Sequence, residues 1–149
     1  MKKTLKVALY ILLALVLIVL AYVIYVFAAY YRVEDWQTLS VVHCDAASAA
    51  PMEGAPQTGV TYRVSSANVG FGAYSDDYSF FMDGGTSSWA ESPETVQYAI
   101  NGAGELVKSL DPDFALIQEI DLDATRSYHT DEYEMLRNLL PEYTTVFAQ

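Results

Sequence analysis

The sequence predicts an α/β domain that follows a single N-terminal transmembrane helix. Two observations indicate this fold class. Residues 7–31 form a long apolar run without any charge. Beyond residue 59, stretches with the period of a strand alternate with stretches with the period of a helix, in the order strand, helix, strand, helix, strand. That alternation is typical of α/β domains.

The apolar run, "VALYILLALVLIVLAYVIYVFAAYY", is long enough to cross a bilayer, because about 20 apolar residues suffice. Lys2, Lys3 and Lys6 precede it within a basic segment, residues 1–6. This bias places the N-terminus in the cytoplasm and the rest outside. The alternative is a cleaved signal peptide, with "FAA" at 27–29 as the cleavage region. Its apolar core would be shorter, about 7–15 residues, so the run favours an uncleaved signal anchor.

The charge after Arg32 is strongly negative. Four basic residues stand against all 19 acidic ones, which gives this part a net charge of −15. Nucleic-acid-binding proteins usually present a basic face. We therefore expect no long DNA or RNA to bind here, whereas acidic clusters attract divalent cations.

Residues 32–58 are expected to be a linker, because alanine, serine, proline and glycine dominate their second half. The segment contains the only cysteine, Cys44, directly after His43. One cysteine excludes an intramolecular disulfide, and the sequence has no zinc-type spacing. A metal pair of His43 and Cys44 is conceivable, but neighbouring residues rarely converge on one ion, so a linker carrying both is favoured.

The domain itself, residues 59–149, begins with a strand of period two that ends near Asn68. Ser92 is a good N-cap for the first helix, and Pro93 suits its first position. An apolar stripe follows at intervals of three and four residues, made of Val96, Ile100, Ala103, Val107 and Leu110. Gly102 and Gly104 weaken this helix, and close packing against a sheet would explain them.

The second strand, Phe114–Glu119, is nearly all apolar, which is typical of a strand covered on both faces. A second helix is capped by Thr130 or Asp131 and ends at Pro141, and a last strand begins in "YTTVFAQ". So small a sheet, covered mainly on one side, would leave an apolar face bare. We therefore expect the chain to be the first part of a larger domain.

Two predicted strands end in polar side chains, Asn68 on the first and Gln118 with Glu119 on the second. Ligands of α/β sheets collect beyond the carboxyl ends of strands. If the two strands are neighbours, Asn68 and Glu119 face one cleft. A carboxylate beside an amide suits Mg²⁺, which often takes one or two carboxylates and keeps several waters. By spacing alone, a turn asparagine and a solvated glutamate are the favoured explanation of these residues.

The motifs "SSANVGFG" and "DPDFALIQEID", about fifty residues apart, resemble the opening of the endonuclease/exonuclease/phosphatase (deoxyribonuclease I-like) superfamily. The resemblance covers residues 61–149 and implies the N-terminal part of a four-layer α/β sandwich that uses Mg²⁺ or Mn²⁺. It implies that Glu119 ligates the metal, that Asn68 lies beside metal or substrate phosphate, and that Gln118 supports them. Many nucleases of the superfamily have Asp where this chain has Gly70, which argues against a DNA-repair nuclease.

The superfamily's other catalytic groups, a His, an Asp–Asn pair and a terminal Asp–His, come later in the fold. They activate water and stabilise the charge that builds on phosphorus. His129 comes too early in the order to match either catalytic histidine. We therefore expect residues 1–149 alone to be inactive, and expect the missing groups to be encoded beyond Gln149.

Three further features each have a functional and a structural interpretation. Arg126 either clamps a substrate phosphate or is a surface residue. The acidic residues Asp76, Asp77 and Asp83 either bind a second cation or form a solvated loop. Aromatic side chains of the same loop either form a lip facing lipid or substrate or pack beneath the loop; they are Tyr74, Tyr78, Phe80, Phe81 and Trp89.

The sequence thus predicts a membrane-anchored, extracytoplasmic, Mg²⁺-dependent phosphoesterase of nuclease, phosphatase or sphingomyelinase type. Its expected partners are the bilayer, through residues 7–31, and a phosphate-ester substrate. The alternative is a membrane-tethered α/β segment that binds or scaffolds without catalysis, in which the metal residues are vestigial.

Overall fold

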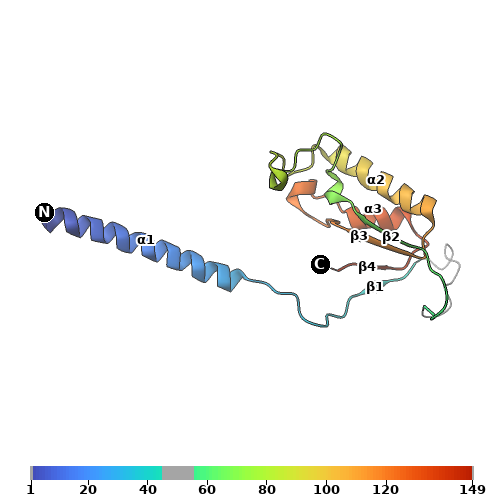
Figure 1. The fold of residues 1–149 in the computed structure, drawn as a ribbon, viewed down its shortest axis with the longest axis horizontal. Helices are drawn as coiled ribbons and strands as arrows, with labels where there is room; N and C mark the ends of the chain where they lie inside the picture. Colours follow the sequence, from blue (N-terminus) through green and yellow to red (C-terminus); the bar gives the residue numbers. More distant parts are fainter. Residues whose placement is uncertain (1, 45–55, 149) are drawn as a thin grey trace. The chain divides into compact units, whose positions relative to one another are not determined.

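A computed structural model describes residues 2–44 and 56–148 (Figure 1). The chain divides into two units, Met1–Thr38 and Leu39–Gln149. We describe each unit by itself. The expected linker residues 45–55 lie outside the described part.

The first unit is dominated by helix α1, Lys2–Ala29, in which every described side chain is exposed. Its 28 residues are long enough and apolar enough to span a membrane. At 1.5 Å per residue the helix is about 42 Å long, which exceeds the roughly 30 Å of a hydrocarbon core. The helix includes the three lysines, so it begins before the predicted span 7–31 and ends two residues earlier.

The second unit is built on two parallel strands, β2 (Val64–Asn68) and β3 (Phe114–Gln118). Helix α2, Pro93–Leu110, connects them, so the three elements form a β-α-β unit. The predicted strand, helix and strand are therefore confirmed, and each of the two strands is five residues long. The register pairs Val64 with Phe114 and Asn68 with Gln118.

Both domain helices begin at the predicted caps. The Ser92 hydroxyl accepts from the Thr95 amide at 3.2 Å, and Pro93 opens α2. Helix α3, Glu132–Leu139, begins after Asp131, whose carboxylate accepts from the Glu134 amide at 2.8 Å. These side chains satisfy amide groups that have no partner inside the helix.

The core joins the loop after β2 to the inner faces of α2 and α3. Its buried members are Phe71, Ala73, Ala90, Val96, Ile100 and Leu136, and Ile117 of β3 packs against them. Three residues of the predicted α2 stripe, Val96, Ile100 and Val107, are buried, whereas Leu110 is 46% exposed.

The helices cover only one face of the parallel sheet. Ile117 packs on the core, whereas Leu116 points to the opposite face of the sheet and is 55% exposed. Val64 lies on the same face as Leu116 and is 57% exposed. The prediction that Phe114–Glu119 is covered on both faces is therefore wrong, while the expected bare apolar face is present. An uninterrupted apolar run in the sequence does not indicate whether helices cover one face of the strand or both.

A second, two-stranded antiparallel sheet joins β1 (Val41–Val42) to β4 (Thr145–Val146). Strand β1 lies within the range expected to be a linker, residues 32–58. Its two β-branched residues suit a strand, and the pairing partner lies about a hundred residues away, beyond the reach of local pattern analysis. Cys44 follows β1, and its amide donates to the Thr144 hydroxyl at 3.4 Å.

Candidate functional site

The carboxyl ends of β2 and β3 lie side by side, as the sequence analysis required. Beyond the strand pairing, the Val69 amide donates to the Gln118 carbonyl at 3.1 Å, and the Phe71 amide donates to the Glu119 carbonyl at 2.9 Å. These bonds continue the parallel pairing into the two following loops. They hold the backbone of the segments that carry Asn68 and Glu119.

The side chains of Asn68 and Glu119 meet across this edge. Asn68 Nδ2 donates to Glu119 Oε1 at 2.9 Å, and Asn68 Oδ1 accepts from the Gly70 amide at 2.8 Å. The second bond fixes the orientation of the Asn68 amide, so its NH₂ group points at the carboxylate. Asn68 is thus a turn residue whose amide also contacts the Glu119 carboxylate.

Glu119 has an unusual backbone conformation, with φ of +57°. A non-glycine residue in the left-handed region costs about 1–3 kcal/mol, and such residues cluster at functional sites. The hydrogen bond from the Phe71 amide to the Glu119 carbonyl helps to hold this conformation. The chain therefore accepts local strain where the predicted metal carboxylate turns toward Asn68.

The donor set suits a hard cation. Glu119 is exposed, and only its Oε1 atom hydrogen-bonds to another described side chain. Nowhere in residues 2–44 and 56–148 do three His, Cys, Asp or Glu side chains cluster as a closed metal cage. Magnesium is commonly held by one or two carboxylates plus water and substrate phosphate, so a single carboxylate fits that chemistry.

Gln118 turns away from this pair. Its Nε2 donates to the Ser66 hydroxyl at 3.3 Å and to the Leu116 carbonyl at 3.2 Å, along the exposed sheet face. Gln118 thus contributes to the site through its backbone carbonyl, which receives the Val69 amide, and its side chain stabilises the strands.

Arg126 lies near the site but is already engaged. Its Nε and Nη2 atoms donate to the two carboxylate oxygens of Asp121 at 2.9 and 2.8 Å. Its guanidinium carbon lies 4.1 Å from the centre of the Phe71 ring. The charges of Asp121, Glu119 and Glu132 help to raise the Arg126 pKa, although the hydrogen bond to Asp121 is the largest cause. Arg126 therefore connects the loop after β2 to the loop after β3.

Glu132 is an unpredicted member of this region. Its side chain is fully buried. Glu132 Oε2 accepts from the Asp121 amide at 3.0 Å, while the Glu132 amide donates to the Asp121 carbonyl at 3.0 Å. Its Oε1 atom has no hydrogen-bond partner among the described residues. Burial is the main cause that raises the Glu132 pKa from its ordinary value of 4.5 to about 7, and the Asp121 charge adds to it.

Glu132 was not predicted to have a role, because an acidic residue in the first turn of a helix is ordinary. Asp121 and Ser127 were also missed. The Ser127 hydroxyl is buried and donates to Asp121 at 2.9 Å. The only sequence signal is the five-residue spacing of Asp121 and Arg126, which is common in surface loops.

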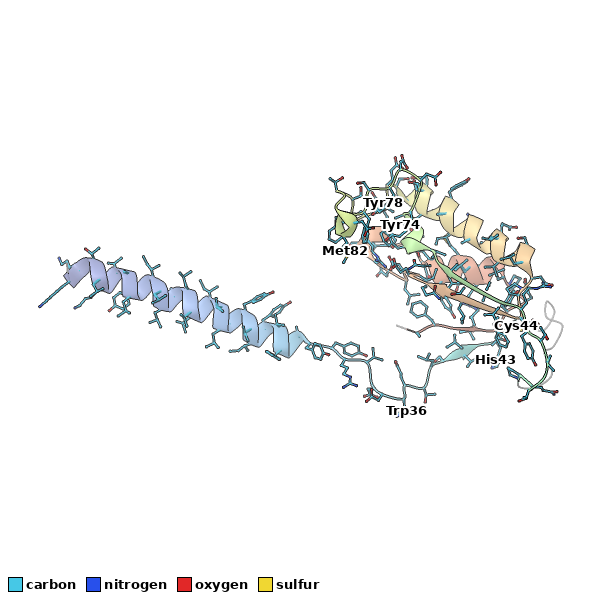
Figure 2. The ribbon with its side chains drawn as sticks, in the orientation of Figure 1. Trp36, His43, Cys44, Tyr74, Tyr78 and Met82 are labelled. Atoms are coloured by element: carbon cyan, nitrogen blue, oxygen red, sulfur yellow. The ribbon has the colours of Figure 1, made fainter. Side chains whose placement is uncertain are left out.

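The remaining predicted groups lie elsewhere or pair locally. His129 Nδ1 lies 2.5 Å from Asp123 Oδ1, and both side chains are well exposed. Asp77 accepts from the Ser75 hydroxyl at 2.7 Å. Figure 2 shows Tyr74, Tyr78 and Met82 at one end of the domain, and His43 with Cys44 near its other end.

Comparison of the chain with models of known protein families, with characterised proteins and with solved structures finds no match. The resemblance to the endonuclease/exonuclease/phosphatase superfamily therefore remains a prediction that rests on the two motifs.

Proposed function

We propose that this chain carries the metal-binding edge of a membrane-anchored, Mg²⁺-dependent phosphoesterase of the endonuclease/exonuclease/phosphatase superfamily. The observation that carries the proposal is the hydrogen bond between Asn68 and Glu119, at the carboxyl ends of two adjacent parallel strands. In this proposal the β-α-β unit is the N-terminal part of a four-layer α/β sandwich. Its bare sheet face is consistent with further elements packing there.

Glu119 would hold the ion through its carboxylate, and Asn68 would keep that carboxylate in place. The bound Mg²⁺ (or Mn²⁺) would polarise a phosphate-ester oxygen for attack by water. Glu119 is well suited because it is exposed and its Oε2 atom makes no hydrogen bond to the described residues. Asn68 adds no charge, so it orients the carboxylate without raising electrostatic repulsion.

Arg126 has a supporting part in this proposal. Its Nε and Nη2 atoms already bond to Asp121, so it holds the two loops together rather than clamping phosphate with its full fork. The Glu119 charge also lies close enough to help raise the Arg126 pKa. Removing Arg126 would loosen the site and would leave Asp121 as an uncompensated charge.

The proposed location is the outer face of a membrane. Helix α1 is apolar enough to serve as the anchor, and the lysines at its start favour a cytoplasmic N-terminus. The acidic domain would then face outward, where divalent cations are available, and long nucleic acids would be repelled.

The test is hydrolysis of bis(p-nitrophenyl) phosphate and p-nitrophenyl phosphate by the full natural chain in detergent, with and without Mg²⁺ or Mn²⁺. We expect metal-dependent turnover that Glu119→Ala abolishes. Glu105→Ala, which removes an equal charge from the exposed face of α2, should leave turnover unchanged. If Glu119→Ala kept full activity, the assignment of Glu119 would fail. Absence of any metal-dependent turnover would favour the non-catalytic alternative.

A further inference from the structure

Helix α2 presents an exposed row of residues spaced four apart, which we call the α2 ridge: Tyr98, Gly102, Leu106 and Leu110. Residues at this spacing are neighbours along a helix surface. Tyr98 is 84% exposed, Leu106 is 57% exposed and Leu110 is 46% exposed. At Gly102 an added Cβ would meet no side chain within 4 Å. The ridge is therefore apolar and exposed, with a notch near its middle.

The surface around the notch carries no charge. Residues 95–104 of α2 contain no acidic or basic side chain, although the domain as a whole is strongly acidic. The exposed residues of this stretch are neutral, and the largest of them is Tyr98. Charged residues are depleted and tyrosine is enriched at the centres of protein interfaces. This part of α2 therefore has the composition of an interface centre.

Gly102 weakens the helix without a packing role in the described domain. A glycine in the interior of a helix is less stable than alanine by about 1 kcal/mol. Gly104 packs closely on leucine side chains of α3, which explains a small residue at that position. Gly102 has no such contact, and its φ is not positive. A second helix approaching from outside would use the gap, because glycine allows close approach of another backbone.

We propose that α2 forms a two-fold symmetric contact with α2 of a second copy of this chain, centred on Gly102. Such an axis makes the two helices antiparallel and brings the same surface of both copies together. Residues equally far from Gly102 then lie opposite each other, so Tyr98 of one copy packs against Leu106 of the other. The two glycines at the centre let the helices approach. Contact between ridges of residues four apart is the commonest class of helix packing.

The ends of α2 are complementary in this arrangement. Glu94 is in the first turn and Lys108 is in the last turn. Antiparallel helices bring Glu94 of one copy beside Lys108 of the other, and the pair occurs twice. Lys108 lies 3.8 Å from Glu105 of its own helix, but both side chains are more than half exposed, so this pair is weak. A surface that is complementary to itself in shape and charge indicates a second copy rather than an unrelated protein.

The contact is small, and the membrane anchor compensates for its size. A standard interface has about 20–30 residues on each side, more than the exposed side of one helix provides. Copies held in one membrane stay at a high local concentration, which allows a small contact to form. Helix α1 is long and apolar enough to provide that anchor. We therefore expect association in the membrane rather than in dilute solution.

The test is resonance energy transfer between full chains in phosphatidylcholine vesicles, with donor or acceptor dyes at the N-terminus and increasing ratios of protein to lipid. We expect transfer above that of randomly placed chains. Tyr98→Ala removes the protruding ring, and Gly102→Leu fills the notch. Each should require about tenfold more protein per lipid for half-maximal transfer. Met82→Ala, which removes a 72% exposed side chain from a different surface, is the matched control and should leave transfer unchanged.

The charges at the helix ends test the antiparallel geometry. At low ionic strength, Glu94→Lys and Lys108→Glu should each weaken self-association, because both pairs across the contact become repulsive. A mixture of donor-labelled Glu94→Lys chains and acceptor-labelled Lys108→Glu chains should recover transfer, because opposite charges then meet at both pairs. Glu119→Ala should associate as wild type does, since the contact does not depend on the proposed function.

The outcomes separate loss of the contact from loss of the fold. Gly102→Leu should raise the midpoint of thermal unfolding, because leucine favours helices over glycine, so its weaker association would not come from unfolding. Random-level transfer in wild type, or unchanged association in Tyr98→Ala or Gly102→Leu, would overturn the proposal. A mixture of the two charge variants that associates no better than either variant alone would also overturn it.

Discussion

The most informative stability experiment replaces the buried carboxyl group at residue 132. Glu132 is fully buried, and burial raises its pKa from 4.5 to about 7. Between these two pH values the folded protein binds a proton that the unfolded chain releases. The contribution of Glu132 to stability is therefore fully present below pH 4.5 and is lost as the pH rises through 7.

The loss of stability at high pH follows from the shift in the Glu132 pKa. A rise from 4.5 to about 7 corresponds to a loss on the order of 3 kcal/mol once the pH is well above 7. Glutamine has the shape of the protonated acid and does not ionise. Its amide oxygen can accept from the Asp121 amide as Glu132 Oε2 does. Glu132→Gln should therefore match wild-type stability at pH 4.5 and exceed it by roughly that amount at pH 8.5.

The assay is urea unfolding of the full chain in detergent, followed by tyrosine and tryptophan fluorescence at pH 4.5, 6, 7 and 8.5. The exposed Glu134→Gln, on the same helix, is the control and should follow the wild-type pH dependence, apart from a small constant offset. The reasoning is refuted if Glu132→Gln and wild type show the same change in stability between pH 4.5 and pH 8.5.

Four further substitutions test the packing. Arg126→Lys should lower the free energy of unfolding by about 2 kcal/mol in urea titrations, because an ammonium cannot replace the two-pronged bond or the ring contact; no loss would refute the bridging role. Gly102→Ala should stabilise α2 by about 1 kcal/mol, because a Cβ at residue 102 would lie in open space. Gly104→Ala should stabilise it less or destabilise it, because a Cβ at residue 104 would lie 2.7 Å from a leucine methyl group of α3. Equal thermal shifts for the two alanine variants would contradict this. Ser92→Ala should cost about 1 kcal/mol through the lost cap, seen as a lower midpoint in thermal unfolding.

Local patterns were enough to predict the order of elements in the domain. Ser92 and Pro93 mark the start of α2 because capping depends on residues within one turn. The same holds for Asp131 at the start of α3. The strand end near Asn68 was also predictable from the change to polar and glycine residues, and the second strand ends at Gln118, one residue before the predicted Glu119.

Relations between distant segments were not predictable in this way. Strand β1 forms only because Thr145 and Val146 lie beside it, and no local signal encodes that pairing. The two helix glycines were expected to face a sheet. In fact Gly104 packs on leucines of α3, and Gly102 has open space around it.

The candidate site was partly predictable for the same reason. Asn68 and Glu119 could be named, because the ends of parallel strands meet at one edge of a sheet. Their hydrogen bond, the strained backbone of Glu119 and the burial of Glu132 depend on the packing of several loops. The engagement of Arg126 with Asp121 also emerges only in three dimensions, and the sequence, which allowed a phosphate clamp or a surface residue, did not predict this bridge.

The most direct test of the central claim is Mn²⁺ binding, measured by electron paramagnetic resonance of the free ion in titrations of the full chain in detergent. We expect wild type and Glu105→Ala to remove Mn²⁺ from solution with equal affinity, and Mg²⁺ to compete. Glu119→Ala should lose this site, and Asn68→Ala should weaken it to a smaller degree. If Glu119→Ala bound Mn²⁺ as tightly as wild type, or if wild type bound none, the metal site at the ends of β2 and β3 would be contradicted.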